Sequence, residues 1–167
     1  MKTGIDAGSK FIKISYGNGK DDRAIEHFGK VEECIEKLAA EGIITPGESV
    51  FTGHYGDALA RHHKSQVADE VAATVEGVRA SSYGARFIVN VGAGSIRAIE
   101  LDRAGNFHSY RENTLCAAGT GSFLDEQMRR MGFDYDTLRA VPFEENPPDI
   151  ATRCAVFAKS DIIHRQQ

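Results

Sequence analysis

A nine-residue pattern that occurs twice places the strongest constraint on how this chain folds. The first copy is Ile5–Lys13, I-D-A-G-S-K-F-I-K, and the second is Val89–Arg97, V-N-V-G-A-G-S-I-R. Each copy reads as strand, glycine turn and strand, which predicts a hairpin at the start of each half of the chain. Four aligned pairs mark the repeat: Asp6 with Asn90, Gly8 with Gly92, Ile12 with Ile96, and Lys13 with Arg97.

The glycine turns of both copies suit the binding of phosphate. A tight turn exposes successive backbone N–H groups, and such a nest accepts anionic oxygens. We therefore assign cofactor binding to the turn residues Gly8, Ser9, Lys10, Gly92, Ala93 and Gly94. Asp6 ends the first strand and is placed to orient a magnesium ion through its waters, since that cation usually keeps several. For each motif taken singly, the alternative is an ordinary hairpin turn.

The remaining patterns predict an α/β chain with a mixed sheet flanked by helices. Strands are expected at residues 3–8, 10–16, 23–28, 49–52, 86–91, 95–102 and 106–111. Helices are expected at residues 31–40 and 67–82, with a short helix ending near His62-His63. The repeat divides the chain into a first half, residues 1–85, and a second half, residues 86–167.

The stretch 116–121, C-A-A-G-T-G, places a cysteine before a turn of small residues. Apolar side chains at helical spacing follow, so a helix is expected to begin near Thr120 or Ser122. Its N–H groups and positive dipole end would face Cys116, which favours a thiolate or an anionic cofactor there. A small buried cysteine is the alternative, because free cysteine is usually a core residue. Cys34 is assigned to that second class.

Composition argues against several classes of protein. The net charge is −4, and the basic residues are scattered among acids, so no nucleic-acid surface is expected. No apolar run approaches a membrane span, and the N-terminus is no signal peptide. The three cysteines are irregularly spaced and predict no disulfide framework. We expect a reduced, soluble, cytoplasmic protein that binds neither nucleic acid nor membrane.

These motifs resemble those of the ATPase-activator family of 2-hydroxyacyl-CoA dehydratases and benzoyl-CoA reductases. The resemblance covers essentially the whole chain and is most specific at Cys116–Gly121 and at Arg153–Asp161, R-C-A-V-F-A-K-S-D. It implies the ribonuclease H-like fold that acetate and sugar kinases, heat-shock chaperones and actin share. It also implies that ATP or ADP binds with magnesium at the glycine turns.

The resemblance further implies a [4Fe–4S] cluster ligated by Cys116 and Cys154. Such a cubane takes four thiolates, so two per chain imply a cluster shared across the two-fold axis of a homodimer. Helices that follow the cysteines would direct their positive ends at the cluster. Cofactor contacts are assigned to the small residues before and at the start of the first helix, Gly119, Thr120 and Gly121. Ser160-Asp161 is expected to cap a last helix, 162–167.

The second glycine turn departs from the family pattern D-I-G-G-Q-D-x-K, because residues 90–97 are N-V-G-A-G-S-I-R. Asn90 supplies no carboxylate, and Ser95 stands where the family has its second aspartate. Catalytic roles are therefore assigned to Asp6 and Ser95. A carboxylate that positions water or metal contributes ~10²–10⁴-fold to rate, so hydrolysis is expected to be slow or absent. In the first turn, Lys10 replaces a threonine.

Weaker motifs complete the sequence evidence. Thr52–Gly56, T-G-H-Y-G, resembles the family's T-G-Y-G-R, and Glu70 resembles the glutamate of its E-I-T motif, with a plain helix-face charge as the alternative. Residues 142–148 are expected to form an exposed loop. The histidines outside the first of these motifs share no metal-ligand spacing and are assigned to the surface or to helix ends: His27, His62-His63, His108 and His164.

The function implied by the resemblance is energy-coupled electron transfer. ATP binding and hydrolysis would change the angle between the cluster-flanking helices and make an electron available to a dehydratase or reductase partner. One alternative is a non-hydrolytic iron–sulfur or scaffolding domain of a larger activase, and another is a cluster-free, sugar-kinase-like phosphotransferase lobe. Relatives are longer, so residues 1–167 are expected to be an N-terminal lobe, as in large multi-domain activases, without the C-terminal adenosine-binding lobe.

Overall fold

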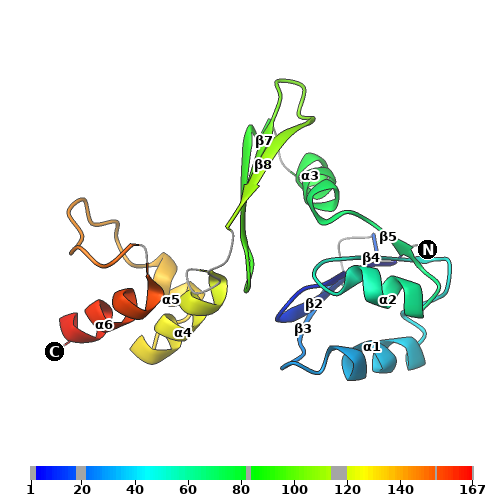
Figure 1. Cartoon of the computed structure of the whole chain (residues 1–167), viewed down its shortest axis with the longest axis horizontal. Coiled ribbons are helices and arrows are strands. Elements are labelled where there is room, and N and C mark those ends of the chain that lie inside the picture. The colour runs from blue at the N-terminus through cyan, green and yellow to red at the C-terminus, as the bar shows by residue number, and fades with distance from the viewer. Residues whose placement is uncertain (1–2, 18–21, 82–83, 114–119, 153, 167) are drawn as a thin grey trace. The chain divides into compact units, whose positions relative to one another are not determined.

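The computed structural model describes residues 3–17, 22–81, 84–113, 120–152 and 154–166. Two compact units make up the chain, residues 1–90 with 97–111 (unit 1) and residues 91–96 with 112–167 (unit 2). These bounds follow packing, whereas the sequence division at residue 85 follows the repeat. Figure 1 shows the elements in the order β1 (Thr3–Ala7), β2 (Phe11–Ser15), β3 (Arg23–Glu26), α1 (Val31–Ala40), β4 (Ser49–Thr52), α2 (Gly56–His62), β5 (Gln66–Val67), α3 (Glu70–Ser81), β6 (Phe87–Val91), β7 (Ile96–Leu101), β8 (Phe107–Glu112), α4 (Gly121–Met131), α5 (Tyr135–Arg139) and α6 (Ala155–Arg165).

A five-stranded mixed sheet, in the order β3-β2-β1-β4-β5, forms the base of unit 1. The hairpin partner β2 runs antiparallel to β1, and β4 runs parallel to it, with Asp6 opposite Thr52. Alternation puts one set of strand side chains on a single face, where helices α1 and α2 cover it (Figure 1). The resulting core comprises Ile5, Ala7, Ile12, Ile14, Val31, Ile35, Leu38, Ile44, Phe51, Leu59 and Ala60.

The second hairpin belongs to a three-stranded sheet in the order β6-β7-β8. Hydrogen bonds pair residue 101 with 86 and residue 92 with 95, so β6 and β7 run antiparallel. Helix α3 packs on this sheet through Val75, which forms a small core with Ile99 and Leu101. Each repeat therefore folds as the strand, turn and strand that the sequence predicts.

Helices α4, α5 and α6 make up most of unit 2. Gly132 ends α4 in the left-handed conformation, and Asp134 caps α5 through the Thr137 N–H. The Lys159 ammonium on α6 bonds to the Glu126 carboxylate on α4 and holds the pKa of Glu126 below its ordinary value. That contact joins the two helices that follow the cysteine motifs.

Most elements lie where the sequence places them, and helix 31–40 and strand 49–52 match their predicted bounds. Three expectations are wrong. Val67 belongs to β5, and α3 begins only at Glu70, because the Asp69 carboxylate accepts the Ala72 N–H and caps the helix there. The last helix begins at Ala155 rather than at residue 162, and Asp161 accepts the Ala151 N–H instead of capping.

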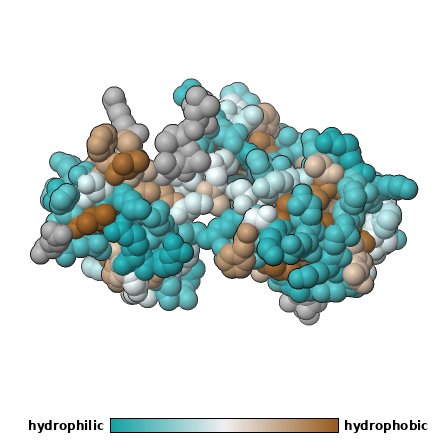
Figure 2. All heavy atoms as spheres, turned by 60° about the horizontal axis from the view of Figure 1, so that its bottom comes forward, coloured by the Kyte–Doolittle hydropathy of each residue, from teal (hydrophilic) through white to brown (hydrophobic). Residues whose placement is uncertain are grey.

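None of the helices in the described part of the chain combines the length and apolar character needed to cross a bilayer. The face shown in Figure 2 is mostly hydrophilic and is interrupted by apolar patches. Strongly exposed apolar side chains include Phe143, Val156 and Phe157 of unit 2. Two of these, Val156 and Phe157, directly follow Cys154 and Ala155 in the chain.

Candidate functional site

The first glycine turn closes between β1 and β2 in unit 1. The Gly8 N–H donates to the Phe11 carbonyl at 3.0 Å, and a Cβ at Gly8 would lie only 3.2 Å from that oxygen. The Ala7 carbonyl accepts the Tyr55 N–H at 2.9 Å, which ties the turn to the loop before α2. The structure thus brings Asp6, Gly8, Ser9 and Lys10 together at the carboxyl end of β1.

His27 contacts the first glycine turn through its ring and is buried, so its assignment to the surface is wrong. Its Nδ1 accepts the Gly29 N–H, and its Nε2 lies 3.1 Å from the Gly8 carbonyl oxygen. Because Nδ1 acts as an acceptor, the ring proton sits on Nε2 and is donated to Gly8. Sequence spacing offered no sign of this role, because two strands, β2 and β3, separate Gly8 from His27 along the chain.

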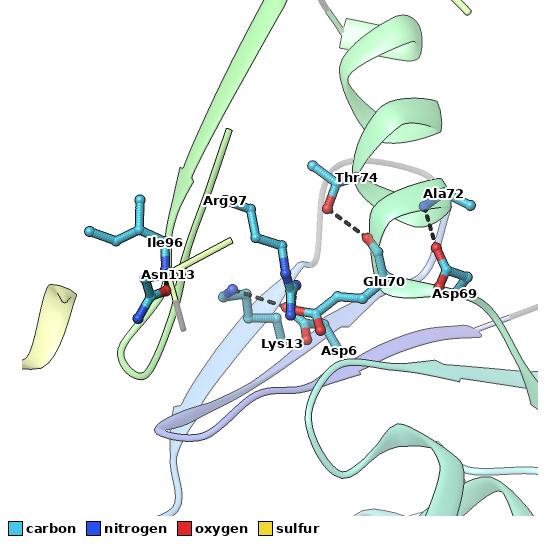
Figure 3. Close-up of polar contacts among 9 residues, drawn as sticks. All are labelled: Asp6, Lys13, Asp69, Glu70, Ala72, Thr74, Ile96, Arg97 and Asn113. Atoms are coloured by element: carbon cyan, nitrogen blue, oxygen red, sulfur yellow. Dashed lines mark hydrogen bonds and ion pairs between the residues drawn. The ribbon is translucent and has the colours of Figure 1, made fainter. Parts of the chain in front are cut away.

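Asp6 is held in place by its neighbours on two sides. Its carboxylate accepts a hydrogen bond from Lys13 Nζ at 3.0 Å (Figure 3). Gly53, at a φ of +87°, packs so closely that an added Cβ would overlap Asp6 Oδ1 and lie 2.9 Å from the Ala7 carbonyl oxygen. Only glycine fits this position, since it combines a positive φ with missing space.

Thr52 is the first residue of the T-G-H-Y-G motif and was assigned no role from the sequence. It lies opposite Asp6 at the end of the neighbouring parallel strand. Its Oγ1 is buried and has no hydrogen-bond partner in the described part of the chain. A buried hydroxyl of this kind calls for a ligand or water. The carboxyl ends of two adjacent parallel strands are also where ligands usually bind in open α/β sheets.

The second glycine turn closes between β6 and β7, and the start of α4 packs directly on it in unit 2. The Gly92 carbonyl accepts the Gly121 N–H at 2.9 Å, and the Ala93 carbonyl accepts the Thr120 hydroxyl at 2.6 Å. A Cβ at Gly121 would lie 2.8 Å from the Gly92 oxygen, so this contact requires glycine. Residues 92–95 thus lie with Thr120 and Gly121, while the catalytic role of Ser95 stays a prediction.

Both turns share one electrostatic property. Their carbonyl oxygens accept hydrogen bonds from the surrounding protein, as described for residues 7, 8, 92 and 93. The N–H groups of Ser9, Ala93 and Gly94, by contrast, donate no hydrogen bond within the described residues. The N–H groups of Ser9, Ala93 and Gly94 are therefore suited to bind an anion.

Glu70 and Arg97 form an ion pair across two elements of unit 1. An Arg97 nitrogen lies 2.5 Å from a Glu70 oxygen, and Figure 3 shows the guanidinium directed at that carboxylate. The Arg97 side chain is 14% exposed and that of Glu70 is 35% exposed. The pair is therefore partly desolvated, which strengthens the Coulomb attraction between the two charges.

Cys154 is the N-cap of α6, half-buried and not in a disulfide. The first N–H groups of a helix carry partial positive charge, which attracts an anionic group at this position. Cys116 and Gly119 fall at 114–119, outside the described residues. Their assignments as cluster ligand and cofactor contact stay predictions.

Comparison with known proteins identifies a matching family. The BadF/BadG/BcrA/BcrD ATPase family matches residues 5–167. The chain is 32% identical over 167 residues to the activator of lactoyl-CoA dehydratase of Anaerotignum propionicum, covering 98% of this chain and 60% of the relative. It is 30% identical over 169 residues to the 2-hydroxyisocaproyl-CoA dehydratase activator of Clostridioides difficile, covering 98% and 59%.

A solved structure agrees with the sequence comparison. The activator of the 2-hydroxyisocaproyl-CoA dehydratase from Clostridium difficile, with bound ADPNP, superimposes with a TM-score of 0.74 at 26% identity. The match covers 99% of this chain and 65% of the activator. The predicted actin-like α/β fold is thereby confirmed. The chain spans about three-fifths of the length of both curated activators named above.

Proposed function

The chain belongs to the BadF/BadG/BcrA/BcrD ATPase family, and from that membership we propose that it is the nucleotide-binding part of an ATP-dependent activator. The partner would be a 2-hydroxyacyl-CoA dehydratase or a benzoyl-CoA-reductase-like protein. The observation that carries the nucleotide assignment is the polarity of the two glycine turns. The carbonyl oxygens of Ala7 and Gly8 in the first turn, and of Gly92 and Ala93 in the second, are engaged, while the N–H groups of Ser9, Ala93 and Gly94 are left for phosphate oxygens.

Asp6 is the residue that would hold magnesium beside the first turn. Lys13 and Gly53 fix its carboxylate, and the Thr52 hydroxyl beside it still lacks a partner among the described residues. Magnesium usually binds through one or two carboxylates, waters and substrate phosphates, and these donors fit that pattern. The bound ion would supply charge that neutralises the phosphates, while Asp6 sets its orientation.

Cys116 and Cys154 would hold an iron–sulfur cluster shared between two chains. Cys154 fits this role because it is half-buried, reduced and placed at the N-terminus of α6. The exposed side chains of Val156 and Phe157 beside it support a homodimer, since burying them needs a second surface. When bound, a [4Fe–4S] cluster supplies one-electron transfer. The Lys159–Glu126 contact keeps α6 joined to α4, the helix that follows the Cys116 motif.

A second candidate is a domain that binds nucleotide without hydrolysing it. Asn90 supplies no carboxylate, and the Glu70 carboxylate is already engaged by Arg97. Under this candidate the chain binds ATP and ADP, but its turnover stays at the rate of the uncatalysed reaction.

The test is anaerobic purification of the chain, followed by iron and sulfide analysis and an absorption spectrum. A shared cubane gives ~2 iron atoms per chain in a dimer. Cys116→Ser and Cys154→Ser should each remove the iron, whereas Cys34→Ala, which changes a cysteine packed against the core, should retain it. Iron-free protein after anaerobic reconstitution would reject the cluster.

Nucleotide binding and hydrolysis are measured on the same samples. Calorimetry with ADP and with ATP tests the two glycine turns, and steady-state phosphate release separates the two candidates. Turnover above background supports the hydrolytic activator. Binding without turnover supports the second candidate, and absence of both would overturn the nucleotide assignment.

A further inference from the structure

A third group of reactive side chains lies on the helical layer of unit 1, where neither the glycine turns nor the cysteine motifs take part. It consists of Glu36 on α1, His62 at the end of α2, and His63, which follows α2. The Glu36 Oε1 atom lies 3.5 Å from His62 Nε2 and 4.0 Å from His63 Nε2. Across the three side chains, one ligand atom from each lies within 4.8 Å of the others. One ion can therefore contact all three.

We propose that Glu36, His62 and His63 bind a divalent cation of the zinc class and so link α1 to α2. Two imidazole nitrogens and one carboxylate oxygen are typical ligands of zinc, which often binds three protein groups and a water. Magnesium and calcium do not fit, because they prefer all-oxygen sites. This inference is independent of the proposed activator function.

The geometry needs only small side-chain movements to close around the ion. Zinc bonds of about 2.0–2.1 Å place tetrahedral ligand atoms roughly 3.3 Å apart, somewhat closer than the present separations. His63 is the fixed ligand, because its side chain is 12% exposed and its ring stacks on Phe51. His62 and Glu36 are 70% and 62% exposed, so their side chains are free to rotate toward it.

The surroundings also favour a cation. A cavity of about 290 Å³ is lined by the three ligands, by Glu32 one helical turn before Glu36, and by apolar Ile35, Ala58 and Leu59. The two carboxylates at this cavity attract a cation, and the open space leaves a fourth coordination position for water.

Sequence spacing alone did not reveal this group, and the assignment of His62-His63 to a helix end missed the contact with α1. The apolar residues Ile35 on α1 and Leu59 on α2 are both buried in the same core. Glu36 follows Ile35 directly, and His62 lies three residues after Leu59, so the packing of these two apolar residues brings Glu36 and His62 together at the rim of the core. Only the packing of two helices brings the ligands together.

Zinc titration of the reduced full chain, with any affinity tag removed, tests the site. Calorimetry should detect one zinc ion per chain whose affinity falls in His62→Gln and in Glu36→Gln. The loss should be at least the roughly 10–100-fold that removing an outer-shell partner costs a metal site. His108→Gln, which changes an exposed histidine on β8, is the matched control and should bind as the unaltered chain does. Zinc should also raise the Tm in the unaltered chain and the control, and not in the two variants.

Substituting cobalt for zinc then identifies the ligands by their absorption spectrum. A cobalt spectrum with d–d bands and no thiolate charge-transfer band supports imidazole and carboxylate ligation. Unchanged zinc affinity in both His62→Gln and Glu36→Gln would overturn the proposal, as would loss of the same zinc ion in Cys116→Ser or Cys154→Ser. These two ligand variants are preferred to a His63 variant, because both side chains are exposed and their replacement leaves the core intact.

Discussion

The β1–β2 hairpin and the β6–β7 hairpin support their glycine turns in different ways. The first turn is braced from within unit 1, by the His27 ring and by the loop at Gly53. The second is braced by the start of α4, through Thr120 and Gly121. In both hairpins the supports engage two carbonyl oxygens, and N–H groups in the turn stay without an acceptor among the described residues, so two unrelated supports leave similar donors.

The charged residues of the two hairpins differ more than their backbones. In the first, Lys13 pairs with Asp6, an acid of the same hairpin. In the second, Asn90 takes the place of that acid, and Arg97 pairs instead with Glu70 on α3. The basic residue is thus kept in both copies, and its partner moves to another element. The first hairpin retains an acid beside its turn, and the second does not.

The largest expected effect comes from making the first hairpin resemble the second. Asp6→Asn removes the acid that would hold magnesium, and under the hydrolytic candidate ATP turnover should fall by ~10²–10⁴-fold. Steady-state phosphate release measures the change, and calorimetry measures whether magnesium still strengthens ADP binding. Asp57→Asn, at an exposed acid in the first turn of α2, is the control. Equal turnover and equal magnesium dependence in Asp6→Asn and the control would remove Asp6 from the site.

The brace at Gly53 is expected to give the next largest effect. Gly53→Ala forces a side chain against Asp6 and Ala7 at a positive φ, which should cost about 1–3 kcal/mol of unfolding free energy. Gly77→Ala is the matched control, because nothing lies within 4 Å of its added Cβ and α3 should gain about 0.5–1 kcal/mol. Urea denaturation compares the two variants. A Gly53 variant as stable as the unaltered chain would mean that the loop does not fix Asp6.

Gly121→Ala extends the same comparison to the second hairpin. Its added Cβ would lie 2.8 Å from the Gly92 oxygen, so α4 has to move away from the turn. We expect weaker nucleotide binding with a smaller loss of stability than in Gly53→Ala, because Gly121 lacks a positive φ. ADP calorimetry and urea denaturation measure the two effects. Unchanged ADP affinity would separate α4 from the phosphate site.

Local patterns were sufficient to predict most of the fold. Helix 31–40 and strand 49–52 were predicted to the residue, because apolar spacing and flanking turn residues act over a few positions. The helix start at Glu70 was missed, since the valine pattern runs on through Val67 while Asp69 caps the helix. The early start of α6 was missed for the opposite reason, because Cys154 is not a typical capping residue.

The candidate site was predicted less completely than the fold. The turn residues were identified from the repeat, since glycine and the flanking strands are local features. The contacts that support the turns are long-range: His27 reaches Gly8, and Thr120 reaches Ala93. The partner of Arg97 is likewise fixed only when α3 packs on the second sheet. Such pairings depend on tertiary packing, which spacing along the chain does not encode.

Making the second hairpin resemble the first should have a smaller effect than the Asp6 change. Asn90→Asp restores an acid at the position that matches Asp6, and we expect ATP turnover to rise about tenfold, well below the range that a fully positioned carboxylate contributes. The gain is limited because Arg97 stays paired with Glu70. Phosphate release is measured beside Asn106→Asp, a change of the same kind in the β7–β8 turn. A rise in both variants would point to a general charge effect.

The smallest effects are expected from the two ion pairs, compared by double-mutant cycles. The cycle of Glu70→Gln with Arg97→Gln should give a coupling of about 1–2 kcal/mol, because contacting groups couple by roughly 0.5–3 kcal/mol and the Arg97 side chain is only 14% exposed. The cycle of Asp6→Asn with Lys13→Gln should give about 0.2–1 kcal/mol, since the Lys13 side chain is 63% exposed. Urea denaturation at low and high salt measures both, and only the second coupling should fall markedly with salt. Equal couplings with equal salt dependence would show that the Arg97–Glu70 pair is no stronger than the Lys13–Asp6 pair.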